Sequence, residues 1–164
     1  MGGVAGLEMP RNEYGLLDLS EIKQRVDTLA AKIGAPESSV PSCGQNWADD
    51  HPYYEVSWAY HLVERQRGEE HRRWTTDLDE ALYWGFETVT FNMASDYQVR
   101  HRVEGEDSRW MLFAYQLQLL NILDPAWPEK RVAKLPVRFR KAFAADAGLV
   151  DRILAGEFPK NYTV

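Results

Sequence analysis

The sequence of 164 residues contains a single cysteine, Cys43. An internal disulfide is therefore impossible, and the fold must depend on its hydrophobic core, for which this chain length is sufficient. No segment approaches the roughly 18 consecutive apolar residues that a membrane-spanning helix needs. The first residues lack the basic region of a signal peptide, and Glu8 interrupts their apolar run. We therefore expect a cytoplasmic protein that does not associate with membranes.

Motifs of catalysis and cofactor binding are also missing. The chain has no Gly-x-Ser-x-Gly turn, no Walker-type phosphate loop and no Gly-x-Gly-x-x-Gly fingerprint. Cys43 lies among Pro and Ser residues without a neighbouring Lys or Arg, so we expect an inert thiol. The histidines lack the spacing of metal-ligand pairs and are expected to be solvent-exposed: His51, His61, His71 and His101. We predict a non-enzymatic protein with no metal and no cofactor.

The composition is that of a folded protein with an uneven charge. Hydrophobic residues make up 45% of the chain and aromatic residues 12%, including six Trp, which argues against disorder. The net charge is −6. Residues 1–50 carry eight acidic and four basic side chains, residues 51–107 carry twelve and six, and residues 108–164 carry five and nine. The first two-thirds are therefore acidic and the end is basic, which bears on partners rather than on the fold.

The first half of the chain predicts one helix, a loop and three strands. Apolar residues at helical spacing indicate a helix from Ser20 or Asp18 to Gly34. Residues 34–52, which contain three prolines, indicate a long loop. Aromatic and β-branched residues predict strands over 53–58, 60–66 and 69–75, with a hairpin turn at Arg67-Gly68.

The second half predicts helices. We expect them over 77–103, from 107 or 108 to 123, from 126 or 128 with a kink or restart at Pro136, and over 149–154. The predicted fold class is α+β, with a three-stranded antiparallel β-meander packed against a bundle of about four helices. Residues 1–164 are expected to form one domain, in which residues 1–18 are a loose leader and residues 136–164 are a C-terminal extension.

Acidic side chains gather around the expected central helix. Asp77, Glu80 and Glu87 share one face of it because they are three and seven residues apart. Further acids lie in the loop after the helix and in the preceding hairpin: Glu104, Glu106, Asp107, Glu69 and Glu70. They predict either a negative surface that attracts a basic partner or a solvated helix face with favourable N-terminal charges.

Two other features are candidates for binding. Basic residues three, seven and ten apart predict a stripe along one helix: Arg131, Lys134, Arg138 and Lys141. This stripe would bind nucleic-acid phosphates, face solvent or pair with the acidic half, and the overall pI near 5.2 makes nucleic acid the weaker interpretation. Trp47, Trp58 and Trp74 lie in loop or strand positions, where an exposed one would anchor an interface.

Four segments of the chain have a distinctive sequence: Ala31–Pro36, Trp74–Trp84, Val89–Ala94 and Leu119–Trp127. Together they resemble the immunity protein 63 family of bacterial polymorphic-toxin systems, and the resemblance spans about residues 20–135. Such families are encoded beside a toxin and protect the producing cell by binding it. The resemblance implies a non-enzymatic cytoplasmic protein whose partner is a cognate toxin domain. It supplies no binding residues, and residues from 136 onward have no counterpart in it.

The leading hypothesis is therefore an immunity protein that neutralises its toxin through an acidic surface, for which a basic nuclease would be a suitable partner. Two alternatives remain open. One is an enzyme or small-molecule binder with a pocket between the sheet and the helices. The other is a nucleic-acid-binding regulator that uses the basic segment 130–141. The sequence does not determine the oligomeric state.

Overall fold

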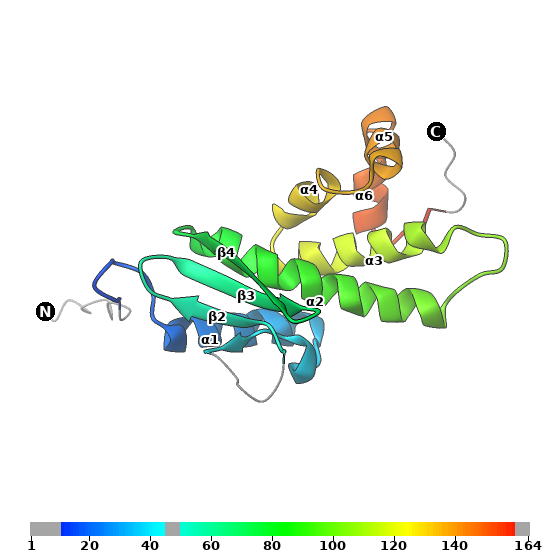
Figure 1. Ribbon diagram of the computed structural model, residues 1–164. Helices are drawn as coiled ribbons and strands as arrows, with labels where there is room; N and C mark the ends of the chain where they lie inside the picture. The colour runs from blue at the N-terminus through cyan, green and yellow to red at the C-terminus, as the bar shows by residue number, and fades with distance from the viewer. Residues whose placement is uncertain (1–10, 45–49, 160–164) are drawn as a thin grey trace, which may run out of the picture. The chain divides into compact units, whose positions relative to one another are not determined.

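The structure, a computed structural model, describes residues 11–44 and 50–159 (Figure 1). The chain divides into two compact units. The sheet unit covers Met1–Thr28 and Val40–Gly85, and the helical unit covers Leu29–Ser39 and Phe86–Val164. Helices α1 (Leu19–Ile33) and α2 (Leu78–Arg100) contribute residues to both units. The expectation of one domain over residues 1–164 stays a prediction.

The sheet has four strands in the order β1-β2-β3-β4. The last three form the predicted antiparallel meander: β2 (Tyr53–Val56), β3 (Tyr60–Gln66) and β4 (Glu69–Thr75). The prediction of three strands is wrong by one, because β1 (Ser42–Cys43) pairs in parallel with β2. The Ser42 N–H donates to the Pro52 carbonyl at 2.9 Å, and the Gly44 N–H donates to the Tyr54 carbonyl at 2.9 Å. Segment 34–52, predicted as loop, thus contributes a strand to the sheet.

One face of the sheet lies against helices within the sheet unit (Figure 1). The Tyr54 hydroxyl donates to the Ala81 carbonyl of α2 at 2.9 Å, and Tyr54 is 1% exposed. A Cβ at Gly85 would lie 2.0 Å from the Tyr54 hydroxyl oxygen, so only glycine lets the strand and α2 approach this closely. Ile22 of α1 lies beside Tyr54 and Tyr60 on the same side. We call this the inner face.

The chain before α1 is held by local contacts. Asp18 accepts a hydrogen bond from the Glu21 N–H at 3.0 Å and caps α1. Of the two predicted starts, Asp18 and Ser20, Asp18 is therefore the N-cap. Arg11 and Leu17 form an antiparallel bridge, and the Leu17 N–H donates to the Tyr60 hydroxyl at 3.0 Å. Residues 11–17 of the expected leader therefore contact the sheet unit, whereas residues 1–10 lie outside the described part of the chain.

The helical unit contains four further helices. They are α3 (Ser108–Leu123), α4 (Trp127–Val132), α5 (Val137–Ala145) and α6 (Leu149–Leu154), which confirms the predicted elements. Pro136 is the N-cap of α5, because its fixed φ of −52° suits a helix start and its missing N–H costs nothing there. A short 3-10 helix, η1 (Glu37–Ser39), follows α1. The predicted α+β class is confirmed.

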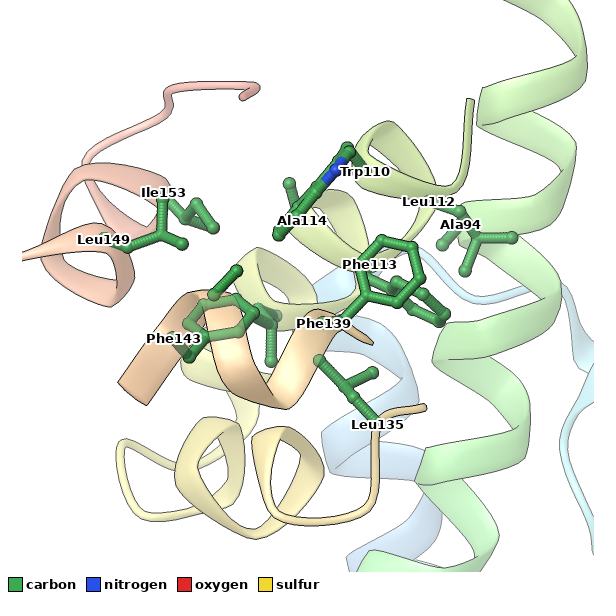
Figure 2. Close-up of a cluster of buried hydrophobic side chains, with 12 residues drawn as sticks. Ala94, Trp110, Leu112, Phe113, Ala114, Leu135, Phe139, Phe143, Leu149 and Ile153 are labelled. Carbon is green, nitrogen blue, oxygen red and sulfur yellow. The ribbon is translucent and has the colours of Figure 1, made fainter. Parts of the chain in front are cut away.

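Aromatic and aliphatic side chains from α3, α5 and α6 converge in the core of the helical unit (Figure 2). The ring of Phe139 packs edge-on against Trp110 and Phe113, with centroid distances of 4.7 and 4.8 Å. Leu149 and Ile153 of α6 are 2% and 0% exposed in the same core. The segment expected to be a C-terminal extension thus supplies a large share of this core.

Candidate protein-binding surface

The face of the sheet opposite Tyr54 carries a different set of side chains. Side chains alternate between the two faces along each strand. Because Tyr54 and its partner Leu62 belong to the inner face, the alternate positions of the three strands belong to the outer face: Tyr53, Glu55, His61, Val63, Arg65, Glu70, Arg72 and Trp74. The outer face is therefore aromatic and charged.

Two tryptophans form an exposed aromatic patch on this face. Trp58 lies in the turn between β2 and β3 and is 49% exposed, and Trp74 of β4 is 57% exposed. Their rings meet at a tilted angle of 64° with centroids 4.8 Å apart. The His61 ring packs edge-on against Trp58 at 5.0 Å. We call Trp58, His61 and Trp74 the aromatic patch.

His61 supports the patch from below. It is 5% exposed, so the prediction of a solvent-exposed histidine is wrong at this position. Burial lowers the pKa of His61, and the neighbouring Arg72 lowers it further. The ring is therefore neutral at neutral pH and packs against Trp58 without placing a charge beneath the tryptophans. Its Nε2 lies 3.2 Å from the Ser57 hydroxyl.

An ion pair crosses the middle of the outer face. Nη1 of Arg72 on β4 donates to Oε2 of Glu55 on β2 at 2.6 Å, so the pair spans the central strand β3. Val63, the cross-strand partner of Arg72, is completely buried. Because Arg72 and Glu55 pair within the chain, their polar groups have a defined position beside the aromatic patch.

The predicted acids of the sheet unit lie at two separate places. Glu69 and Glu70 are exposed at the start of β4, next to the hairpin turn. Asp77 follows the end of β4 and caps α2, where it accepts hydrogen bonds from the Asp79 N–H at 2.9 Å and the Glu80 N–H at 3.4 Å. The length of β4 separates the two groups by about 20 Å.

In the helical unit, Glu87 faces basic side chains of the same unit. Its Oε1 lies 3.6 Å from Nη1 of Arg131, and its Oε2 lies 3.6 Å from Nζ of Lys134. The Arg131 side chain is only 12% exposed, and its Nε donates to Oε1 of the fully buried Gln116 at 2.8 Å. The charge of Glu87 is therefore balanced inside the unit.

Asp107 is also balanced within the helical unit. It caps α3 by accepting from the Arg109 N–H at 3.1 Å, and Arg109 Nε and Nη2 donate to its two carboxylate oxygens at 3.0 and 2.9 Å. Arg138 of α5 donates to the same carboxylate at 3.1 Å. The Arg109 hydrogen bonds hold the pKa of Asp107 below its usual value. The neighbouring Glu104 is exposed and Glu106 is half-buried.

These contacts also determine where the predicted basic stripe lies. The prediction of a stripe along one helix is wrong, because Arg131 belongs to α4 and Arg138 and Lys141 belong to α5. Three of its four members, Arg131, Lys134 and Arg138, pair with Glu87 or Asp107. An internal partner for the acids therefore accounts for most of the stripe, and a continuous phosphate-binding face is not formed.

The described residues show little that points to catalysis or to a small-molecule ligand. Burial raises the pKa of Cys43 to about 11, so its thiol is protonated at neutral pH. Residues 11–44 and 50–159 contain no group of three or more His, Cys, Asp or Glu placed to hold a metal ion. An apolar crevice of about 180 Å³ lies between the sheet and the helices of the sheet unit, below the size of ordinary ligand pockets.

No helix within the described part of the chain has the length and apolar character that crossing a membrane requires.

The aromatic patch was only partly predictable. The positions of Trp58 and Trp74 in turn and strand segments marked them as candidates, but their exposure depends on which sheet face lacks a helix. Trp47, the third candidate, lies outside the described residues. His61 and the Arg72–Glu55 pair were not predicted, since their partners come from different strands.

Comparison with known proteins gives one match. Residues 56–136 match the family model described as immunity protein 63. The matched segment contains Trp58, His61 and Trp74 of the aromatic patch, and also Glu87 and Asp107. No curated protein and no solved structure matches the chain.

Proposed function

This chain belongs, over residues 56–136, to the immunity protein 63 family, and we propose that it neutralises a cognate toxin by binding it through the aromatic patch. An immunity protein family implies a toxin partner and is typically non-enzymatic, which confirms the prediction that the chain is not an enzyme. The family does not specify a binding surface. The choice of surface therefore depends on the physical chemistry of the side chains.

The observation that carries this proposal is the exposure of Trp58 and Trp74. Large aromatic side chains in contact with water are costly, and at interfaces Trp is among the residues that contribute most binding energy. The two rings are already in contact, and Trp58 also packs against the buried His61, so little side-chain freedom is lost when a partner covers them.

The acids near this surface favour a basic toxin. Only Thr75 and Thr76 separate Trp74 from Asp77, so their Cα atoms are within about 11 Å of each other. Carboxylates and tryptophan faces both attract Lys and Arg side chains. Asp77 and Glu80, with Glu69 and Glu70 at the other end of β4, form the acidic part of the proposed surface. Glu104 and Glu106 are a second acidic group, in the helical unit. A basic nuclease suits this arrangement.

The test is the affinity of the full chain for the toxin domain encoded by the neighbouring gene. We expect a complex, and Trp58→Ala and Trp74→Ala should each weaken it at least tenfold, as expected for interface anchors. Phe91→Ala is the matched control, because Phe91 is an aromatic residue of the helical unit that is 39% exposed. It should change the dissociation constant less than threefold.

The outcomes separate the function from its location. The absence of any complex at micromolar concentration would contradict the toxin-binding function itself. A complex that tolerates both Trp substitutions, with the fold intact by circular dichroism, would retain the function and exclude this surface. Asp77→Lys with Glu80→Lys should mainly slow association with the toxin domain and reduce the salt dependence of that rate, because charges at the rim of an interface act on encounter rates.

A further inference from the structure

The outer edge of β4 is open. The strand order places β4 at the end of the sheet, and among the described residues no strand pairs with its second edge. Every residue from Glu69 to Trp74 is exposed. A seven-residue edge strand presents a row of unpaired backbone groups, which is a template for pairing with another strand.

The hairpin turn determines which backbone groups point outward. Arg67 and Gly68 have φ values of 53° and 82°, as in the two-residue turns that join tight hairpins. In such a hairpin the closing pair, here Gln66 and Glu69, is a hydrogen-bonded pair, and the ladder alternates from there. The outward-pointing N–H and C=O groups therefore belong to Glu70, Arg72 and Trp74.

The charges along β4 are complementary to their own reverse order. The strand reads Glu69, Glu70, His71, Arg72, Arg73: two acids, a histidine and two bases. In an antiparallel pair of two copies with the two-fold axis at His71, Glu70 lies opposite Arg72 of the second copy. In the same register, Glu69 lies opposite Arg73 of the second copy. Opposite charges at directly facing positions stabilise a pair of strands.

The neighbouring registers are unfavourable. Because only Glu70, Arg72 and Trp74 direct N–H and C=O groups outward, the backbone allows only registers in which these residues of one copy lie opposite the same set in the second copy. With the axis at Arg72, two arginines face each other, and with the axis at Glu70, two glutamates face each other. Like charges at facing positions are destabilising. Charge and backbone geometry therefore select the same register, with His71 at the axis.

The arginines are already positioned for this pairing. Arg72 forms an ion pair with Glu55, and Nη2 of Arg73 lies 3.8 Å from Oε2 of Glu64. The Arg72 and Arg73 side chains nevertheless remain 37% and 43% exposed. A guanidinium has five N–H donors, so each arginine is able to bind a second carboxylate. The register also brings Trp74 level with Gly68 of the second copy, where no side chain obstructs it.

We propose that this edge binds a second copy of the chain, joining two four-stranded sheets through antiparallel β4 strands. The interface is isologous, as two-fold symmetry requires. Edge pairing uses Glu69 and Glu70 but leaves Trp58 on the outer sheet face uncovered, so the dimer keeps the aromatic patch, Asp77 and Glu80 for the toxin.

A disulfide trap tests the register. In a Cys43→Ser background, His71→Cys places two thiols opposite each other at a non-hydrogen-bonded position, where Cα atoms are about 4.5 Å apart. This separation allows a disulfide. Oxidation should give a covalent dimer on a non-reducing gel. Glu69→Cys is the matched control, because it lies on the same face but its two copies would be about 13 Å apart. It should form no cross-link and should run as a monomer on the same gel.

Sedimentation of the unmodified chain at about 100 μM, which populates even a weak dimer, tests the association itself. The wild type should sediment as a dimer, and Glu69→Arg with Glu70→Arg should shift it to monomer. The control, Glu104→Arg with Glu106→Arg, makes the same charge change in the helical unit and should leave the dimer intact. The proposal would be overturned if the wild type sedimented as a monomer and the His71→Cys variant formed no cross-link. Protection of the β4 edge only in the toxin complex would also overturn it.

Discussion

In the helical unit Trp110 and Trp127 are 1% and 2% exposed, whereas in the sheet unit Trp58 and Trp74 are 49% and 57% exposed. The charged side chains differ in the same way. Glu87 and Asp107 of the helical unit each contact two basic side chains. In the sheet unit, Glu69 and Glu70 lie exposed at an open strand edge. In the helical unit these tryptophans are buried and these acids are paired, whereas in the sheet unit the corresponding side chains are exposed to solvent.

The comparison teaches that local charge in the sequence is a poor guide to a binding surface. Asp77, Glu80 and Glu87 share helical spacing. Asp77 nevertheless caps α2, and Glu87 pairs with Arg131 and Lys134. A charge that is balanced within its own unit contributes little to steering a partner. Exposed aromatic side chains are the stronger indicator, because about half of the surface of Trp58 and of Trp74 remains in contact with water.

The largest expected effect is in the core of the helical unit. Phe139→Ala removes a fully buried ring that contacts Trp110 and Phe113. We expect the free energy of unfolding to fall by about 3–5 kcal/mol, measured by urea denaturation. Val137→Ala, two residues earlier and 55% exposed, should cost less than about 1 kcal/mol. Equal losses for the two variants would contradict the assignment of this core.

A smaller effect is expected at the internal ion pairs. Glu87→Ala leaves Arg131, whose side chain is 12% exposed, without its carboxylate. The expected loss is about 1–3 kcal/mol, because a largely buried charged group loses its partner. Glu104→Ala is the control: Glu104 is exposed in the loop after α2 and should change stability by less than about 0.5 kcal/mol. If the control cost as much, Glu87 would not be internally balanced.

The smallest effect is expected at Asp107, and it depends on pH. Asp107→Asn keeps an N-cap acceptor but removes the charge that Arg109 and Arg138 bind. Because the folded pKa of Asp107 is lowered from 3.8, its charge stabilises the fold above that value. This stabilisation is lost as the pH falls through the folded pKa.

At neutral pH the Asp107→Asn variant should therefore be less stable than the wild type by under about 1 kcal/mol, as for exposed ion pairs. The difference should shrink as the pH is lowered below about 4 and vanish in stronger acid, as followed by thermal unfolding at a series of pH values. A difference that stays constant across this range would show that the charge of Asp107 has no part in stability.

Local patterns in the sequence predicted most helices and the meander. Asp107 was one of two residues predicted to start α3, Pro136 was predicted to be a kink or a restart, and Arg67-Gly68 was predicted to be the hairpin turn, because caps, prolines and turns act through neighbouring residues. Strand β1 escaped prediction because Ser42 and Cys43 have no periodicity, and their strand exists only through backbone bonds to the segment around Tyr54.

The candidate surface was harder to predict for the same physical reason. The exposure of Trp58 and Trp74 depends on which face of the sheet the helices cover, which no local pattern encodes. The pairing of Glu87 with Arg131 joins α2 to α4 and likewise depends on tertiary packing. Glu87 and Asp107 were counted in the acidic surface proposed from the sequence, but both pair with basic residues that are distant along the chain.

Hydrogen exchange in the toxin complex tests most directly where the partner binds. Backbone exchange would be compared between the chain alone, dilute enough to be monomeric, and the chain saturated with the toxin domain. Binding through the aromatic patch predicts slowed exchange in residues 53–77, with the turn around Trp58 and the junction of β4 with α2 most affected. Slowed exchange confined to residues 108–154 of the helical unit would contradict it.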